Sequence, residues 1–270
     1  MRVRAIWLTY AVVGVATLIT YWRLAAGSTY HFDDSGWSGA GSRLVTYVNY
    51  PVALAAIAVV GAVARGRLTW LAIALCAVVA APGVVSQDDL AATWANAPAV
   101  VGVALAVWLT WWAPPPRRRV PLGSLRVMLI TLLAVWSLPW VIAAMGLYAQ
   151  DLPLAGSLIH SRQPTPGEPH LASVHLGLHE GLFGAMLAVT ALVLSARRMP
   201  ALLSLYLSLL LCYGLAVTAN DGWHEQVVKR GWSDTKLPSV LTPSLSVAWA
   251  VVLASSLAVH LLWFQRQRHR

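Results

Sequence analysis

Long apolar stretches separated by short polar segments dominate the chain. A helix needs about 20 predominantly apolar residues to cross the hydrocarbon core of a bilayer. Stretches of this length, or close to it, lie at residues 5–22, 44–64, 68–86, 97–113, 127–149, 172–196, 201–219 and 244–264. The pattern predicts an all-α fold: a polytopic membrane helix bundle with about eight transmembrane helices in a single integral membrane domain, residues 1–270.

The polar segments alternate in charge along the chain. One set is short and basic, and it holds 13 of the 19 Lys and Arg residues: Arg2, Arg4, Arg65, Arg67, Arg117, Arg118, Arg119, Arg126, Arg197, Arg198, Arg266, Arg268 and Arg270. All ten acidic residues lie in or beside the other, longer set. The positive-inside rule assigns the basic set to the cytoplasm. We therefore expect a multi-pass protein of the cell (plasma) membrane with both termini cytoplasmic.

Composition supports the membrane interpretation and excludes a nucleic-acid-binding one. Hydrophobic residues make up 58% of the chain and charged residues 11%, against about 25% charged in soluble domains. The net charge of +9 comes from basic residues between apolar stretches, without a basic patch or RNA-binding aromatic motif. The partners we expect are membrane lipids, a lipidic substrate and other membrane proteins, but no nucleic acid.

The middle of the chain suggests a division into two halves. Pro114–Pro116, followed by three arginines, forms a stiff cytoplasmic linker between residues 1–113 and 127–270. The segments 85–89 and 217–221, Val-Ser-Gln-Asp-Asp and Val-Thr-Ala-Asn-Asp, occupy matching places in the two halves. The pattern suggests a 4+4 repeat.

The sixth apolar stretch differs from the others because its uninterrupted part, 182–194, has only 13 residues. To span the bilayer, this helix must extend back through Glu180 and His179 toward His175. Ionisable groups at that depth are costly unless they face protein or a water-filled cavity. Gly177, Gly181 and Gly184 place small residues on one face of the same helix, which predicts close packing at the centre of the bundle.

The chemistry-bearing residues gather on the predicted outer side of this helix. His175 and His179, four residues apart, share a helix face at about 6 Å and form a pair suited to a metal ion. Our first choice for the third ligand is His224, just beyond the seventh stretch, with Asp221 or Glu225 as alternatives. Zinc is the default for such a site, and iron or copper are alternatives.

Three carboxylates are candidates for proton transfer: Glu180, Glu225 and Asp221. We interpret the cluster as the site of a metal-dependent membrane enzyme acting on a lipidic or membrane-associated substrate. An ion- or proton-coupled transporter, or an accessory subunit of a membrane complex, would use the same residues differently. A structural polar network explains the cluster equally well. His260 stands alone in the eighth stretch and is interpreted as a packing residue.

Overall fold

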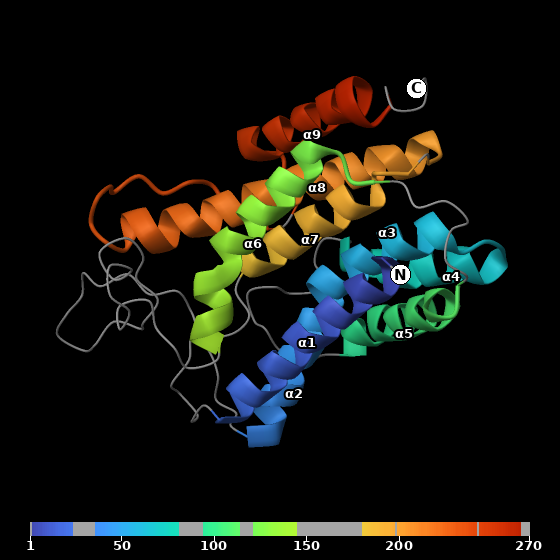
Figure 1. Cartoon of the computed structure of the whole chain (residues 1–270). Helices are drawn as coiled ribbons and strands as arrows, with labels where there is room; N and C mark the ends of the chain where they lie inside the picture. The colour runs from blue at the N-terminus through green and yellow to red at the C-terminus, as the bar shows by residue number, and fades with distance from the viewer. Residues whose placement is uncertain are drawn as a thin grey trace.

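The computed structural model describes residues 2–23, 36–80, 94–113, 121–144, 180–197, 199–241 and 243–265, and all regular secondary structure within these ranges is helical (Figure 1). The first group of helices comprises α1 (Arg2–Arg23), α2 (Gly36–Tyr47), the π-helix η1 (Val48–Val52), α3 (Ala53–Val63), α4 (Arg67–Ala77), the 3₁₀ turns η2 (Val78–Ala80) and η3 (Trp94–Asn96), and α5 (Ala97–Trp111). The second group comprises α6 (Ser124–Ala144), α7 (Glu180–Leu194), α8 (Ala201–Trp223), the π-helix η5 (His224–Val228), α9 (Val247–Val259) and the π-helix η6 (His260–Phe264).

Five helical segments of the described chain are long and apolar enough to cross a membrane. They are Ala40–Val63, Trp94–Trp111, Ser124–Val141, Ala201–Val228 and Val247–Phe264. Three shorter apolar helices, Val3–Ile19, Arg67–Ala80 and Glu180–Leu194, fall on the remaining predicted stretches. The all-helical class and the membrane-embedded character agree with the sequence-based expectation, whereas the count of eight spans and the 4+4 repeat stay predictions.

The seventh predicted span ends too early. The sequence places its end at residue 219, but α8 runs to Trp223 and η5 continues the helix to Val228. The polar residues after Asn220 do not stop the helix, because Asp221, Gly222 and Glu225 are buried against neighbouring helices. After η5, Gly231 has a φ of +71°, a backbone conformation that a right-handed helix excludes. Asp221, His224 and Glu225 therefore lie on a helix and not in a loop.

Helix α7 lies at the centre of the bundle, between α8 and α6 and against α3 (Figure 1). Twelve of its 15 residues are buried. A Cβ atom added to Gly184 would lie 2.4 Å from the Gly214 carbonyl oxygen, and one added to Gly214 would lie equally close to the Gly184 oxygen. The prediction of a small-residue face on a central helix is confirmed for Gly181 and Gly184, while Gly177 lies outside the described residues.

The bundle has two chemically different ends. The basic end is where α1 begins, α5 and α7 end, and η6 ends (Figure 1), and it carries Arg4, Arg65, Arg67, Arg126 and Arg197. The opposite, acidic end carries Glu180, Asp221, Glu225 and Asp234. The first described helix begins, and the last one ends, at the basic end, while the location of the termini relative to a membrane stays a prediction. Which end faces the cytoplasm stays a prediction from the arginines.

Side-chain hydrogen bonds join the helices of the second group at the basic end. Arg126 on α6 donates from Nε to Ser195 Oγ and from Nη2 to the Ser195 carbonyl oxygen, each at 3.2 Å. His260 lies 3.1 Å from Ser204 Oγ through Nδ1 and 2.8 Å from Gln265 Nε2 through Nε2. With both ring nitrogens bonded and 6% of the residue exposed, His260 is a packing residue as predicted.

Candidate functional site

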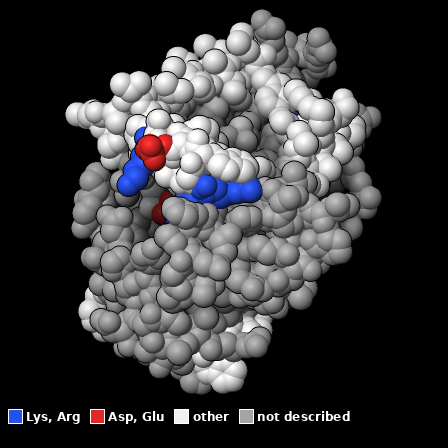
Figure 2. Space-filling view, turned by 90° about the vertical axis from the view of Figure 1, so that its left-hand side faces the viewer, with Lys and Arg blue, Asp and Glu red and all other residues white. Residues whose placement is uncertain are grey.

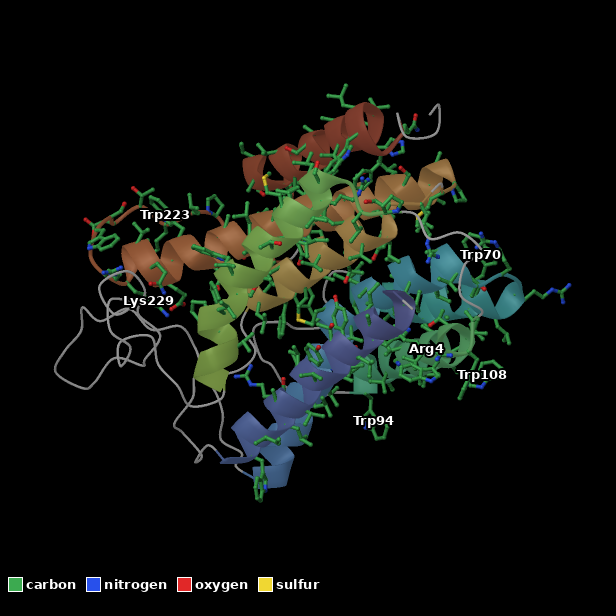
Figure 3. The ribbon with its side chains drawn as sticks, viewed as in Figure 1. Arg4, Trp70, Trp94, Trp108, Trp223 and Lys229 are labelled. Atoms are coloured by element: carbon green, nitrogen blue, oxygen red, sulfur yellow. The ribbon has the colours of Figure 1, made fainter. Side chains whose placement is uncertain are left out.

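Two buried carboxylates lie one helical turn apart at the acidic end of α8 and η5. Asp221 is 5% exposed and Glu225 4% exposed. Residues four apart share a helix face, so both side chains point toward the bundle. Trp223 and Lys229 mark this end of the molecule in Figure 3. Burying a carboxylate is costly unless it is paired, hydrogen-bonded or coordinated to a metal, so each acid calls for its own explanation.

Asp221 lies directly against the beginning of α7. A Cβ atom on Gly181 would lie 2.3 Å from Asp221 Oδ2, so any side chain at position 181 would displace the Asp221 carboxylate. Thr218, one turn earlier on α8, donates a hydrogen bond of 3.0 Å from Oγ1 to the Gly181 carbonyl oxygen. These contacts place Asp221 against the first turn of α7, whose first described residue is Glu180.

Glu225, the third predicted carboxylate, is engaged by a neighbouring cation. Lys229 Nζ lies 2.6 Å from Glu225 Oε1 and 2.8 Å from Oε2, so both carboxylate oxygens accept from one ammonium group. The Glu225 side chain is 5% exposed and that of Lys229 33% exposed. A carboxylate held on both oxygens by a charged partner is a poor general base, and the pair is better suited to anchoring η5.

Two tryptophans of α6 cover the carboxylates. The Trp136 ring packs against Gly222: a Cβ atom added to Gly222 would lie 2.4 Å from Trp136 Cζ2. A Cβ atom added to Gly181 would lie 3.0 Å from Trp140 Cζ2. The two indoles have ring centroids 5.8 Å apart. Trp140 is 2% exposed, and its Nε1 has no hydrogen-bond partner among the described residues. The carboxylates therefore have an apolar wall with one buried N–H donor left over.

Tyr50 and Tyr213 form a hydrogen-bonded pair near Glu180. Tyr213 Oη donates to the Leu241 carbonyl oxygen at 2.8 Å, so its only hydroxyl proton is committed and the Tyr50 hydroxyl donates to Tyr213 Oη. Phe183, one turn after Glu180 on α7, packs against the Tyr50 ring with the two ring centroids 6.0 Å apart. The carboxylate site is defined here as Glu180, Asp221, Trp140, Tyr50 and Tyr213, contributed by α7, α8, α6 and η1.

The sequence analysis did not single out Tyr50, Tyr213 or Trp140. Each lies inside an apolar stretch, where an aromatic residue with one polar atom is ordinarily assigned to packing. One signal was present: Tyr50 precedes Pro51, and a proline within a membrane helix weakens backbone hydrogen bonding and often accompanies local irregularity. The structure shows a π-helix there, a feature frequent at functional sites.

The predicted metal ligands are only partly described. His224 is half-buried at the first position of η5, one turn beyond Asp221. Within the described ranges, no group of three or more His, Cys, Asp or Glu side chains is placed to hold a metal ion. His175 and His179 lie outside the described residues, so the three-histidine set stays a prediction.

Figure 2 views the acidic end directly and shows basic and acidic side chains of the described residues gathered in one part of this face. Lys229, Arg230, Asp234 and Lys236 belong to the segment that follows η5. The Arg230 guanidinium carbon lies 3.8 Å from the centroid of the Trp232 ring, and Trp232 is 64% exposed. This amphipathic surface next to the carboxylate site is typical of a membrane interface.

Comparisons of the chain with protein-family models, with curated proteins and with solved structures find no match. The functional argument therefore depends on the fold and on the carboxylate site. The fold defines a helical membrane protein, and the site defines a buried polar cluster at one end of its central helix pair.

Proposed function

We propose that this protein is a membrane-embedded, metal-dependent enzyme whose site lies at the acidic end of α7 and α8, open to the outer leaflet, and acts on a lipidic or membrane-associated substrate. One observation carries the proposal: the buried Asp221 carboxylate lies directly against Gly181, the residue that follows Glu180 in the chain. A buried acid at membrane depth is costly as mere packing and is typical of functional sites.

The predicted histidine pair precedes Gly181 in the sequence, at positions 175 and 179. In this proposal His175 and His179 supply imidazole ligands and Asp221 supplies a carboxylate ligand, with His224 as the further nitrogen donor. Two histidines with one carboxylate form a set that binds zinc in hydrolytic enzymes and iron in oxygenases; zinc is the first expectation, ahead of iron or copper.

The metal would polarise a substrate oxygen or activate water. Glu180, half-buried on the first turn of α7, is then the group placed to accept or donate a proton. Asp221 and Trp140 are both buried next to Gly181, and charge interactions are stronger in such a low-dielectric setting. Glu225, bound by Lys229, holds η5 in position and is no longer our candidate for proton transfer.

Metal analysis of the purified protein tests the proposal. Wild-type protein in detergent should carry about one transition-metal ion per chain, and His175→Ala combined with His179→Ala should remove it. Asp221→Asn should weaken the affinity for the metal by about 10-fold or more and thereby lower the metal content. Asp234→Asn is the matched control, because Asp234 is an exposed acid at the same end of the bundle.

Two results would overturn the proposal. Wild-type protein without stoichiometric metal, even after incubation with Zn²⁺ or Fe²⁺, would leave the carboxylates as a structural network. Metal content that is unchanged in both the histidine and the Asp221 variants would place any bound ion elsewhere. Loss of metal in the Asp234→Asn control would show that the measurement reports unfolding instead of ligand loss.

A further inference from the structure

An apolar groove with a volume of about 320 Å³ lies between α1, α5 and the segment formed by α2 and η1. Its lining includes Trp7, Gly14, Leu44, Tyr47, Val107 and Trp111. No residue of the carboxylate site lines it. The volume is at the lower end of the range for ligand pockets.

The groove opens on the membrane-facing side of α1. Val15 lines the groove and is 57% exposed, and the same face of α1 carries Leu8 and Val12, which are 53% and 67% exposed. In a membrane-embedded bundle, such a surface faces lipid chains. The residues of α1 that line the groove run from Trp7 to Leu18, about 16 Å along the helix, a length that suits a single hydrocarbon chain of a lipid.

A cation lies one helical turn from the groove, at the basic end. Arg4 is exposed and lies one turn before Trp7 on α1 (Figure 3). Its Nε donates a hydrogen bond of 3.0 Å to the Trp111 carbonyl oxygen, and its guanidinium carbon lies 6.0 Å from the centroid of the Trp111 ring. This bond fixes the guanidinium group through Nε, and none of the described residues accepts from its two terminal nitrogens, a geometry that suits phosphate.

A second hydrogen bond, which does not involve Arg4, also joins α1 to α5. Trp7 Nε1 donates a hydrogen bond of 2.8 Å to Thr110 Oγ1, and both residues are buried. The two helices therefore stay joined next to the groove when the arginine is changed. Arg4 can be tested as a binding residue without dismantling the wall behind it.

We propose that this groove binds one acyl chain of an anionic phospholipid from the leaflet at the basic end, with Arg4 contacting the lipid phosphate. The positive-inside prediction makes this the cytoplasmic leaflet, whose anionic lipids complement a juxtamembrane arginine. The groove supplies the apolar contact, and the arginine supplies the preference for an anionic headgroup.

Native mass spectrometry of the purified full-length protein, titrated with phosphatidylglycerol or phosphatidylcholine of identical chains, tests this proposal. Wild type should prefer phosphatidylglycerol about fivefold, the effect of one basic residue near a membrane surface. Ala11→Phe, which fills the groove from its exposed side, should abolish binding of both lipids at this site. Val12→Phe adds the same bulk outside the groove and should bind as wild type.

Arg4→Gln should equalise the affinities for the two lipids, and Arg4→Lys should restore the preference. Arg67→Gln, an exposed arginine at the same end but outside the groove, should keep it. The proposal is overturned if Ala11→Phe binds phosphatidylglycerol as well as Val12→Phe does, or if Arg4→Gln keeps the fivefold preference. Should Ala11→Phe fail to fold, the Arg4→Gln result decides alone.

Discussion

Replacing Gly184 with alanine should destabilise the protein by forcing α7 and α8 apart. The new Cβ atom would lie 2.4 Å from the Gly214 carbonyl oxygen, 2.6 Å from Thr218 Oγ1 and 2.9 Å from the Thr218 backbone nitrogen. Two of these three atoms belong to the α8 backbone, so no side-chain rotation relieves the contact. Ordinary van der Waals separation requires the helices to move apart by about 1 Å at the crossing, and a gap of that size forfeits up to half of each affected dispersion contact.

Overpacking of a core typically costs about 1–3 kcal/mol, and backbone contacts on both sides place this variant at the upper end. Alanine recovers about 1 kcal/mol through its higher helix propensity. The net loss is therefore about 2 kcal/mol, which corresponds to a decrease in the thermal midpoint of about 4–8 °C. Thermal unfolding of the purified protein in detergent, followed by circular dichroism, measures it.

Gly41→Ala is the matched control, because a Cβ atom on Gly41 in α2 has nothing within 4 Å. It should leave the midpoint unchanged or raise it. The double variant Gly184→Ala, Gly214→Ala should be less destabilised than the sum of the two single variants, since one separation of the helices relieves both contacts. A Gly184→Ala protein as stable as Gly41→Ala would refute the close helix crossing.

Three further predictions follow from individual contacts. Lys229→Met should destabilise the protein by about 3–5 kcal/mol because it leaves Glu225 buried without its cation, and adding Glu225→Gln should recover most of that loss in the same unfolding assay. Trp7→Phe should lower the free energy of unfolding by about 1 kcal/mol because it loses the hydrogen bond to α5. Trp108→Phe, at a residue that is 61% exposed, should leave this free energy unchanged. Equal effects of the two substitutions would contradict the Trp7 hydrogen bond. Tyr213→Phe should cost about 1–3 kcal/mol, because it leaves a loop carbonyl and a second tyrosine hydroxyl without their partner, and it should speed hydrogen exchange in segment 229–241.

Asp221 and Arg4 lie toward opposite ends of the bundle, while the groove itself runs along α1 as far as Leu18. Asp221 meets α7 where that helix begins, whereas Arg4 bonds to Trp111 where α5 ends. A change at one should leave the other measurable, so the metal and lipid experiments are independent. Failure of the metal proposal would not affect the lipid proposal, because no residue is shared between them.

The distribution of apolar and charged residues was sufficient to predict helices, their approximate positions and the chemical difference between the two ends. These properties are local: 20 apolar residues demand a helix in a bilayer whatever their neighbours are, because every backbone polar group must be satisfied within the segment. The small-residue face of Gly181 and Gly184 was predictable for the same reason, since close helix approach requires residues without bulk.

The end of the seventh span shows where local reasoning failed. Polar residues after Asn220 predicted a loop, but burial against α6 and α7 keeps the helix intact to Val228. Whether a buried acid faces a glycine backbone or a lysine depends on which helices pack together, and hydropathy carries no information about that choice. The sequence could propose Asp221 and Glu225 as equivalent proton carriers; only packing separated them.

The sequence by itself determined the class of this protein: an all-helical membrane chain with its acids toward one end of the bundle and arginine-rich segments toward the other. Tertiary structure alone decided that Asp221 meets Gly181, that Glu225 is neutralised by Lys229, and that Tyr50 joins Tyr213 across 163 positions of sequence. The physical reason is that hydrophobic burial is nondirectional, and so predictable from composition, whereas hydrogen bonds and ion pairs require particular atoms from distant helices to meet.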